Sequence, residues 1–290
     1  MRVEWRVLAV PRAFRISTPL NPQLSTLNFP QMHVTILGSG SAGNCSLVET
    51  ARTRLLIDGG LSARQMVARL ALCGVNPLEI DAILLTHEHG DHTGGLKVWC
   101  KQFDTPVYAN SQTAEVLRRD APASRMDWRV FATGGDFEIK DIAIQTFTVP
   151  HDAVDPVGFV LHHRDCALGF LTDLGFATKL VYERVRAVQT LVIETNHCEK
   201  LLQNDTKRPW SVKQRIMSRH GHLSNTAAAG VIAELLNAKL RRAVLGHLSR
   251  DCNSPELAVG AVRERAGEAA LEVFCATQRE VSPRFAVGGG

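Results

Sequence analysis

The sequence predicts an α/β layered fold in which helices cover two β-sheets. Short apolar runs alternate with amphipathic runs, and the order of the two kinds changes along the chain. The early apolar runs follow one another as strand pairs, whereas the later ones alternate with helix-like segments. The length of 290 residues is sufficient for one large domain with a sizeable core.

The strand-like runs are apolar, often β-branched, and bounded by turn residues. They lie at residues 33–37, 45–49, 54–58, 82–86, 106–109, 142–149, 157–162, 167–173, 190–195 and 243–247. The first two are separated by GSGSAGN, which lacks the GxGxxG spacing and the Lys-Ser/Thr ending of phosphate-binding loops. We therefore interpret it as a turn between two strands, placed where it could approach a functional site.

The helix-like runs have apolar residues at spacings of three and four. The clearest is 62–74, in which Ser62 is placed as the N-cap and Gly74 as the stop. In the last run Ser254 is the N-cap and Pro255 takes the first helical position. The remaining helices are expected at 113–119, 178–188, 211–219, 224–237 and 255–266.

The chain divides into one predicted domain and two ends. Residues 17–31 are rich in Pro, Asn, Ser and Thr and show no periodicity, so 1–31 is predicted to be a disordered N-terminal extension. The folded domain is expected to span 32–280. The glycine-rich end, 281–290, is predicted to be a flexible C-terminal tail.

Composition limits the class of protein. Hydrophobic residues make up 45% and charged residues 21%, as in ordinary globular proteins, and the net charge of +4 permits an anionic partner. No apolar run reaches the roughly 18 residues of a membrane span, and the N-terminus lacks the apolar core of a secretory signal. The seven scattered cysteines contain no CxxC and favour reduced thiols, so a cytoplasmic location is expected.

The stretch LLTHEHGDH, residues 84–92, places three histidines with Glu88 and Asp91 at the end of a buried strand. Charged and imidazole groups rarely crowd in this way for packing, because each must be paired or desolvated. Imidazole and carboxylate suit a borderline metal such as zinc. The ligand types His, His, Asp and His within six residues are too many for one open catalytic ion, so two adjacent ions are expected.

This stretch resembles the HxHxDH signature of the metallo-β-lactamase fold superfamily. The other motifs of that superfamily follow in order: Asp58 in LLIDGG, His151 in TVPHD, Asp173 in GFLTDLG and His247 in AVLGHLS. The resemblance covers roughly residues 32–275. It implies a single-domain αββα metallo-β-lactamase-like sandwich with a dinuclear site at the edge between the two sheets.

The resemblance also implies a role for each motif residue. His87, His89 and His151 would bind the first metal, Asp91, His92 and His247 the second, and Asp173 would bridge them. Asp58 would orient a histidine ligand through a hydrogen bond. The cofactors would be two divalent metal ions, of which Zn²⁺ is the first expectation and Mn²⁺ or Fe²⁺ the alternatives. The implied chemistry is hydrolysis by a metal-bridging hydroxide.

Longer stretches narrow the resemblance to the WalJ/YycJ-type subgroup. They are GSGSAGNCSLVET, HDAVDPVGF, LVIETNHCEKLL, WSVKQRIMSRHGHLSN and LGHLSRDCN. The subgroup is associated with 5′→3′ exonuclease activity on double-stranded DNA, which implies DNA as the partner and a role in DNA repair. Cys198 and Cys252 depart from the subgroup, which typically has Asp and Asn there. The interval between Asp173 and His247 leaves no room for the inserted domain of the β-CASP nucleases.

A basic segment precedes GHLSN and is consistent with an anionic polymer. Arg215 and Arg219 are four residues apart and are predicted to share a helix face. Ser224 and Asn225 open a helix whose N–H groups could receive a phosphate. His222, between these features, is a candidate for contacting the scissile phosphate or protonating the leaving oxygen. Alternatively, the charges are a solvated face and this histidine is structural.

Other functions remain open at this stage. A small-molecule hydrolase would act on a cyclic or small phosphodiester, or on a thioester as glyoxalase II does. A metal-containing binding protein with negligible turnover is disfavoured, because none of the predicted ligands is missing. The sequence does not predict the oligomeric state.

Overall fold

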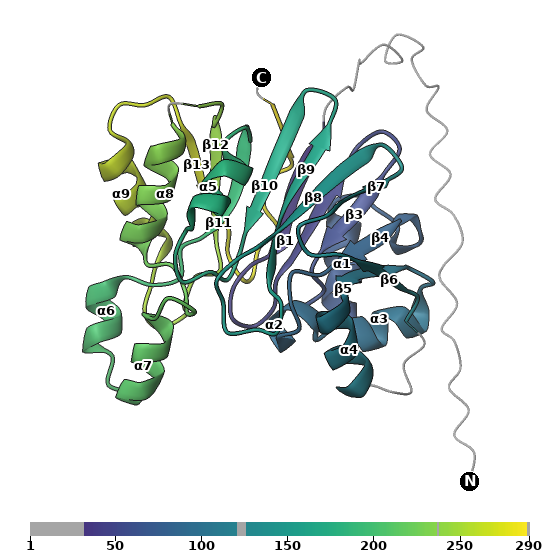
Figure 1. The fold of residues 1–290 in the computed structure, drawn as a ribbon, viewed down its shortest axis with the longest axis horizontal. Coiled ribbons are helices and arrows are strands. Elements are labelled where there is room, and N and C mark those ends of the chain that lie inside the picture. Colours follow the sequence, from purple (N-terminus) through teal and green to yellow (C-terminus); the bar gives the residue numbers. More distant parts are fainter. Residues whose placement is uncertain (1–31, 121–125, 237, 289–290) are drawn as a thin grey trace.

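The structure, a computed structural model, describes residues 32–120, 126–236 and 238–288. It contains two sheets of seven strands each (Figure 1). In order across the first sheet the strands are β14 (Phe285–Ala286), β1 (His33–Gly38), β2 (Cys45–Glu49), β3 (Arg54–Ile57), β4 (Ala82–Leu84), β5 (Val107–Asn110) and β6 (Trp128–Phe131). Across the second they are β13 (Glu272–Cys275), β12 (Arg242–Gly246), β11 (Thr190–Glu194), β10 (Cys166–Leu171), β9 (Val157–His163), β8 (Ile142–Thr148) and β7 (Asp136–Ile139).

Each sheet has an antiparallel half and a parallel half. Strands β1, β2 and β3 pair antiparallel, whereas β3 to β6 pair parallel. The second sheet repeats the plan, with β7 to β10 antiparallel and β10 to β13 parallel. Parallel strands need crossover connections and end at a common edge, which is where α/β folds place functional side chains.

Helices cover the outer face of each sheet, which gives four layers (Figure 1). One apolar cluster packs α1 (Ala63–Leu72), α3 (Leu96–Gln102) and α4 (Ser111–Asp120) on the first sheet. Another packs α5 (Lys179–Val185), α8 (Asn225–Leu235) and α9 (Pro255–Ala266) on the second. A third cluster fills the space between the sheets. The predicted αββα sandwich is therefore confirmed.

Short helices complete the chain. They are α2 (Gly90–Thr93), the 3₁₀ turn η2 (Pro77–Glu79), α6 (Glu199–Asn204) and α7 (Trp210–Ile216). The last two project away from the sheets beneath α8 and α9 (Figure 1). Among the described residues, no helix combines the length and apolar character needed to cross a membrane.

The C-terminal segment differs from the sequence prediction. Residues 281–290 were expected to form a flexible tail, but β14 pairs antiparallel with β1, with Phe285 opposite Val34. Phe285 and Val287 are buried, and Ser282 accepts a hydrogen bond from the Ile36 amide at 2.8 Å. The prediction was wrong because the two apolar side chains of Phe285 and Val287 suffice to extend the edge of the sheet. The glycines that follow them in the sequence obscured this signal. The predicted N-terminal extension, 1–31, lies outside the described residues.

Candidate metal centre

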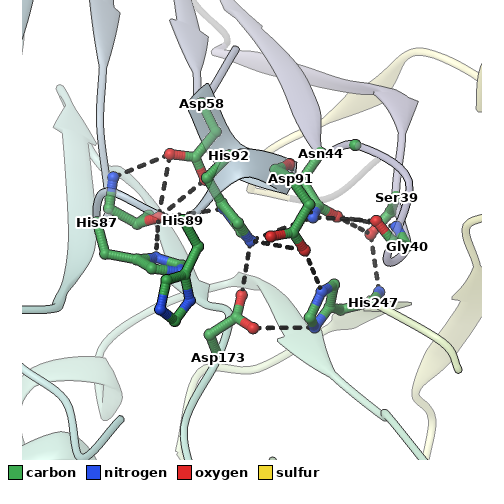
Figure 2. Close-up of polar contacts among 12 residues, drawn as sticks. Ser39, Gly40, Asn44, Asp58, His87, His89, Asp91, His92, Asp173 and His247 are labelled. Atoms are coloured by element: carbon green, nitrogen blue, oxygen red, sulfur yellow. Dashed lines mark hydrogen bonds and ion pairs between the residues drawn. The ribbon is translucent and has the colours of Figure 1, made fainter. Parts of the chain in front are cut away.

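The predicted ligands converge at the edge where the two sheets meet. Figure 2 labels all of them except His151. The first sheet supplies the residues that follow β3 and β4, and the second supplies those that follow β8, β10 and β12. Their donor atoms fall into overlapping groups, each with all atoms within 4.8 Å of one another. The groups are His87, His89 and His151; His87, His92 and Asp173; Asp91, His92 and His247; and Asp173, Glu194, His222 and His247.

The first candidate site consists of His87, His89 and His151. His89 Nδ1 lies 3.0 Å from His87 Nε2 and 3.3 Å from His151 Nε2, so three ring nitrogens face a common point. His151 Nδ1 lies 3.0 Å from the Gly221 carbonyl, to which it can donate a proton, leaving Nε2 free. Burial lowers the pKa values of His87 and His151, which favours the neutral imidazoles that metals require.

The second candidate site consists of Asp91, His92 and His247. Asp91 lies in α2, where its Oδ2 is 3.1 Å from His247 Nε2 and 3.7 Å from His92 Nε2. Burial would raise the pKa of Asp91, but the hydrogen bond with His247 and the nearby His92 lower it, so the carboxylate is ionised. An imidazole–imidazole–carboxylate set of this kind suits a divalent cation.

Asp173 lies between the two candidate sites. Its Oδ2 is 2.9 Å from His92 Nε2, and its Oδ1 is 3.9 Å from His151 Nε2. Oδ2 is buried without a well-aligned hydrogen bond. Burial would raise the pKa of this carboxyl, but the surrounding imidazoles hold it well below its usual range. An ionised, incompletely satisfied carboxylate facing both sets of nitrogens fits a residue that bridges two cations.

Asp58 contacts the His92 imidazole at the ring nitrogen that does not face Asp173. Its Oδ2 is 2.7 Å from His92 Nδ1, and its Oδ1 accepts hydrogen bonds from the amide and hydroxyl of Thr86 at 2.9 and 3.0 Å. His92 Nε2 faces Asp173 on the other side of the ring; burial would lower the pKa of His92, but the charges of Asp173 and Asp58 raise it to about 10. The Asp58 contact is the one expected of a carboxylate that orients a metal ligand.

Three residues of this centre have left-handed backbone conformations. Asp58, Asp173 and His247 have φ values of 61°, 54° and 54°, and each follows the carboxyl end of a strand: β3, β10 or β12. Non-glycine residues rarely adopt this region, and such strain persists only where the surroundings enforce it. The turns fold the three side chains back over the sheet edge toward one another.

Glu194 is a site residue that the sequence analysis missed. It ends β11, is completely buried, and has Oε1 2.7 Å from both His222 Nδ1 and His247 Nδ1. Its Oε2 accepts hydrogen bonds from the Leu174 and Leu223 amides at 3.2 and 3.1 Å. The signal that could have found it is an acid at the end of the apolar strand TLVIE.

His222, the candidate for contacting the phosphate or the leaving oxygen, lies beside Asp173 and Glu194. Its Nδ1 is 3.3 Å from Asp173 Oδ1 as well as 2.7 Å from Glu194, and 19% of its side chain is exposed. Burial would lower the pKa of His222, but the charge of Glu194 dominates and raises it to about 10. The protonated form of this partly exposed imidazole is therefore favoured.

The basic segment is only partly available to a ligand. Arg215 is exposed and lies 3.4 Å from Asp152, and the Arg219 guanidinium stacks 4.2 Å from the centre of the Phe176 ring. The prediction that these two arginines share a helix face was wrong. Helix α7 ends at Ile216, and the chain then turns back tightly at Gly221, whose amide donates to the Ser218 carbonyl.

The other cations of this segment have internal partners. Lys207 pairs with Asp251, and Arg208 pairs with Asp205 and Asp251. Lys213 is buried and donates to the Gln203 carbonyl at 2.9 Å, which ties α7 to α6. Three of the predicted positive charges thus stabilise the lobe formed by α6 and α7.

Ser224 and Asn225 are also engaged inside the protein. The Ser224 hydroxyl accepts from the Ala227 amide as the N-cap of α8 and donates to Glu199. The Asn225 side chain exchanges two hydrogen bonds of 2.8 Å with Asn253. Both residues are buried, so the structure does not favour the predicted phosphate contact.

A comparison with protein families decides the identity of the fold. Residues 53–248 match the model of the Beta-lactamase superfamily domain. The chain belongs to this superfamily. Within it, the chain is 34% identical to the Bacillus anthracis protein named exodeoxyribonuclease YycJ, over 84% of this chain and 93% of that one. It is 35% identical to exodeoxyribonuclease WalJ of Streptococcus pneumoniae serotype 2, over 77% of this chain and 84% of that one.

Solved structures show the same fold at low sequence identity. The superfamily member YhfI from Bacillus subtilis, described as a metallo-beta-lactamase fold protein, has a TM-score of 0.67 at 17% identity and covers 88% of this chain and 99% of its own. Zn²⁺-bound PqqB from Methylobacterium extorquens has a TM-score of 0.66 at 18% identity, over 86% of this chain and 99% of its own.

Proposed function

We propose that the chain is a dinuclear metal-dependent exodeoxyribonuclease that degrades double-stranded DNA from the 5′ end. Relatives named exodeoxyribonucleases are 34% and 35% identical over most of their length. The observation that carries the proposal is the convergence of all seven expected ligands at the inter-sheet edge. As a member of this superfamily, the chain is a metal-dependent hydrolase, and the polarity and strand preference are part of the proposal.

The donor set fits two divalent cations. Imidazole nitrogens and carboxylate oxygens are the ligands of zinc, and manganese or iron accept the same set. We propose that His87, His89 and His151 hold one ion, that Asp91, His92 and His247 hold the other, and that Asp173 contacts both. When bound, the pair would activate a water molecule and neutralise the charge that develops on the phosphate.

Asp91 and His222 are proposed to handle protons on opposite sides of the phosphorus. Asp91 Oδ2 faces His247, and its other oxygen remains available to orient the attacking water. His222 Nδ1 is held by Glu194, so its Nε2 can donate a proton to the leaving 3′ oxygen of the cleaved bond. Asp58 contributes by fixing the orientation of His92.

The surface beside His222 is proposed to bind the phosphates of the DNA. Arg215 and Arg219 are exposed there, on the segment that leads into His222. Each phosphate contact that is lost reduces the dependence of affinity on salt. Replacing both arginines with glutamine should weaken duplex binding and reduce the slope of log Kd against log salt, as measured by fluorescence anisotropy in chelator. Replacement of Lys239 and Arg263 serves as the matched control for charge.

The activity itself is tested with end-labelled duplex DNA. Duplex labelled at the 5′ end should release labelled nucleotide at once, whereas duplex labelled at the 3′ end should shorten progressively. Chelator and Asp91→Ala should abolish both, and Asp165→Ala, in the exposed β9–β10 turn, should not. Turnover of bis-p-nitrophenyl phosphate without any processing of duplex would contradict the proposal and indicate a small-phosphodiester hydrolase. Release of a thiol from a thioester would indicate the glyoxalase II type.

A further inference from the structure

The turn GSGSAGN, residues 38–44, contacts the second candidate site rather than a phosphate. Ser39 Oγ accepts a hydrogen bond from the His247 amide at 2.8 Å and donates to Asn44 Oδ1 at 3.2 Å (Figure 2). The Asn44 amide donates to the Asp91 carbonyl at 2.7 Å. The Ser39 hydroxyl and this backbone amide of Asn44, both in one turn, therefore connect the backbones of Asp91 and His247.

The side chain of Asn44 makes further contacts with the same residues. Its Nδ2 lies 3.3 Å from the Asp91 carbonyl and 3.2 Å from His92 Nε2. Its Oδ1 also accepts from the Gly40 amide at 2.9 Å, which closes the turn. All three residues of the second candidate site are thus contacted by Ser39 or Asn44. Among the described residues, neither makes a hydrogen bond to His87, His89 or His151 of the first site.

The contact to His247 constrains a strained residue. His247 has a φ of 54°, and its amide and carbonyl are both held by buried side chains: the amide by Ser39 and the carbonyl by Asn196 Nδ2 at 3.0 Å. A Cβ atom added at Gly246 would lie only 2.7 Å from Ser39 Oγ, so the turn approaches the β12 end closely. Ser39 belongs to the turn after β1, so its hydroxyl joins the two sheets at the candidate site.

We propose that Ser39 and Asn44 are positioning residues that set the metal affinity of the second site independently of the first. The inference rests on the proposed dinuclear centre and deepens it. The physical reason is that Asp91 and His247 come from different sheets, so a group that links their backbones limits changes in their separation beyond what their direct contact of 3.1 Å does. The Ser39–Asn44 pair provides that link without touching the ion, as supporting hydrogen bonds do in other metal sites.

The experiment is a titration of the metal-free full chain with Co²⁺, followed by its visible absorption and by isothermal calorimetry. The wild-type chain should bind two ions. Ser39→Ala and Asn44→Ala should bind the first ion with unchanged affinity and the second with roughly 10- to 100-fold lower affinity, the usual effect of removing a supporting contact. Ser46→Ala is the matched control, because Ser39 and Ser46 are both 8% exposed and Ser46 makes no hydrogen bond to a candidate ligand among the described residues.

Each alternative outcome is informative. Two ions bound with wild-type affinity by both variants would overturn the inference and leave the proposed nuclease intact. An equal loss of affinity at both sites would assign the turn a general structural role and also overturn it. A wild-type chain that binds only one ion would contradict the dinuclear centre itself, and the inference would fall with the proposed function.

Discussion

At the scale of single residues, the candidate metal centre combines candidate ligands with a second set of polar groups that hold them. Asp58 fixes His92, Gly221 fixes His151, and Glu194 contacts both His247 and His222. Glu194 is fully buried, and a buried carboxylate is tolerated only when it is paired and hydrogen-bonded. Its two imidazole partners and two amide donors meet that requirement and place a protonated His222 beside Asp173.

The role of His222 can be tested through the leaving group. If His222 donates a proton to the leaving oxygen, His222→Ala should slow DNA hydrolysis by about 100- to 10,000-fold. The loss should be much smaller with bis-p-nitrophenyl phosphate, because p-nitrophenolate leaves without a proton. The measurement is kcat for both substrates at saturating metal, with His220→Ala as the exposed neighbouring control. Equal losses on both substrates would argue against proton donation.

At the scale of elements, the two sheets are joined by a polar contact far from the centre. Thr50 and Thr53, in the turn after β2, donate hydrogen bonds to Asp141, in the turn between β7 and β8. Burial would raise the pKa of Asp141, but these hydroxyl donors and His163 lower it below its usual value of 3.8. The ionised carboxylate is therefore the form that stabilises the contact between the two turns.

This contact predicts a dependence of stability on pH. Because the folded-state pKa of Asp141 is depressed, its contribution is present above pH 4 and is lost as the pH falls through the folded-state value. Asp141→Asn should lower Tm at pH 7 and reduce the fall in Tm between pH 5 and pH 3, as measured by calorimetry. Asp165→Asn should leave both unchanged. A variant with wild-type Tm at pH 7 would show that the contact does not stabilise the fold.

The strand β14 makes a second prediction at this scale. Removal of 281–290 would expose the part of the hydrophobic core that Phe285 and Val287 cover. Burial of each of these side chains contributes about 1.5–3 kcal/mol. In a domain of this size each kcal/mol corresponds to about 2–4 °C in Tm. The truncated chain should therefore melt well below the full chain, whereas removal of 289–290 alone should have no effect on thermal melting. A flexible tail would predict no difference for either truncation.

At the scale of the whole molecule, the centre exists only where the two sheets are packed together. The first sheet provides His87, His89, Asp91 and His92, and the second provides His151, Asp173 and His247. Ions that contact both sets would cross-link the sheets. Since the separated sheets would lack part of each ligand set, metal binding is expected to favour the folded chain over the unfolded one.

That expectation can be measured as a metal-dependent Tm. A ligand that binds only the folded state at 100 times its Kd stabilises it by about 2.7 kcal/mol. Zn²⁺ or Mn²⁺ should raise Tm of the chelated wild-type chain, and Asp173→Asn should lose most of the increase because it removes the residue that faces both sites. His162→Ala, which is remote from the centre, controls for adventitious binding to surface histidines. Equal stabilisation of all three proteins would contradict the dinuclear site.

The sequence predicted Asp58 and the candidate ligands because several of them come within three residues of the end of a buried strand. Asp58, His87, Asp173 and His247 share this position, and their motifs identify them one at a time. Glu194 shares this position at the end of β11 but was missed, because its partners His222 and His247 are distant in sequence. The edge strands β6, β7 and β13 were missed because each has only four residues, of which at most one is buried. The end of α7 at Ile216 was also missed, because it depends on the tight turn at Gly221 and not on a local sequence signal.

The left-handed bends at Asp58, Asp173 and His247 bear on the order of events as the chain matures. An isolated strand has no reason to hold such a bend at its tip. The bend at His247 is held in part by Ser39 of the other sheet, whereas Asp58 is held by Leu84 and Thr86 of its own sheet. A partly synthesised chain therefore contains only the local His87–His92 cluster. This cluster is expected to bind ions weakly, because the residues of the second sheet are absent. Capture of the full pair is expected to come after docking, because His151, Asp173 and His247 are provided by the second sheet.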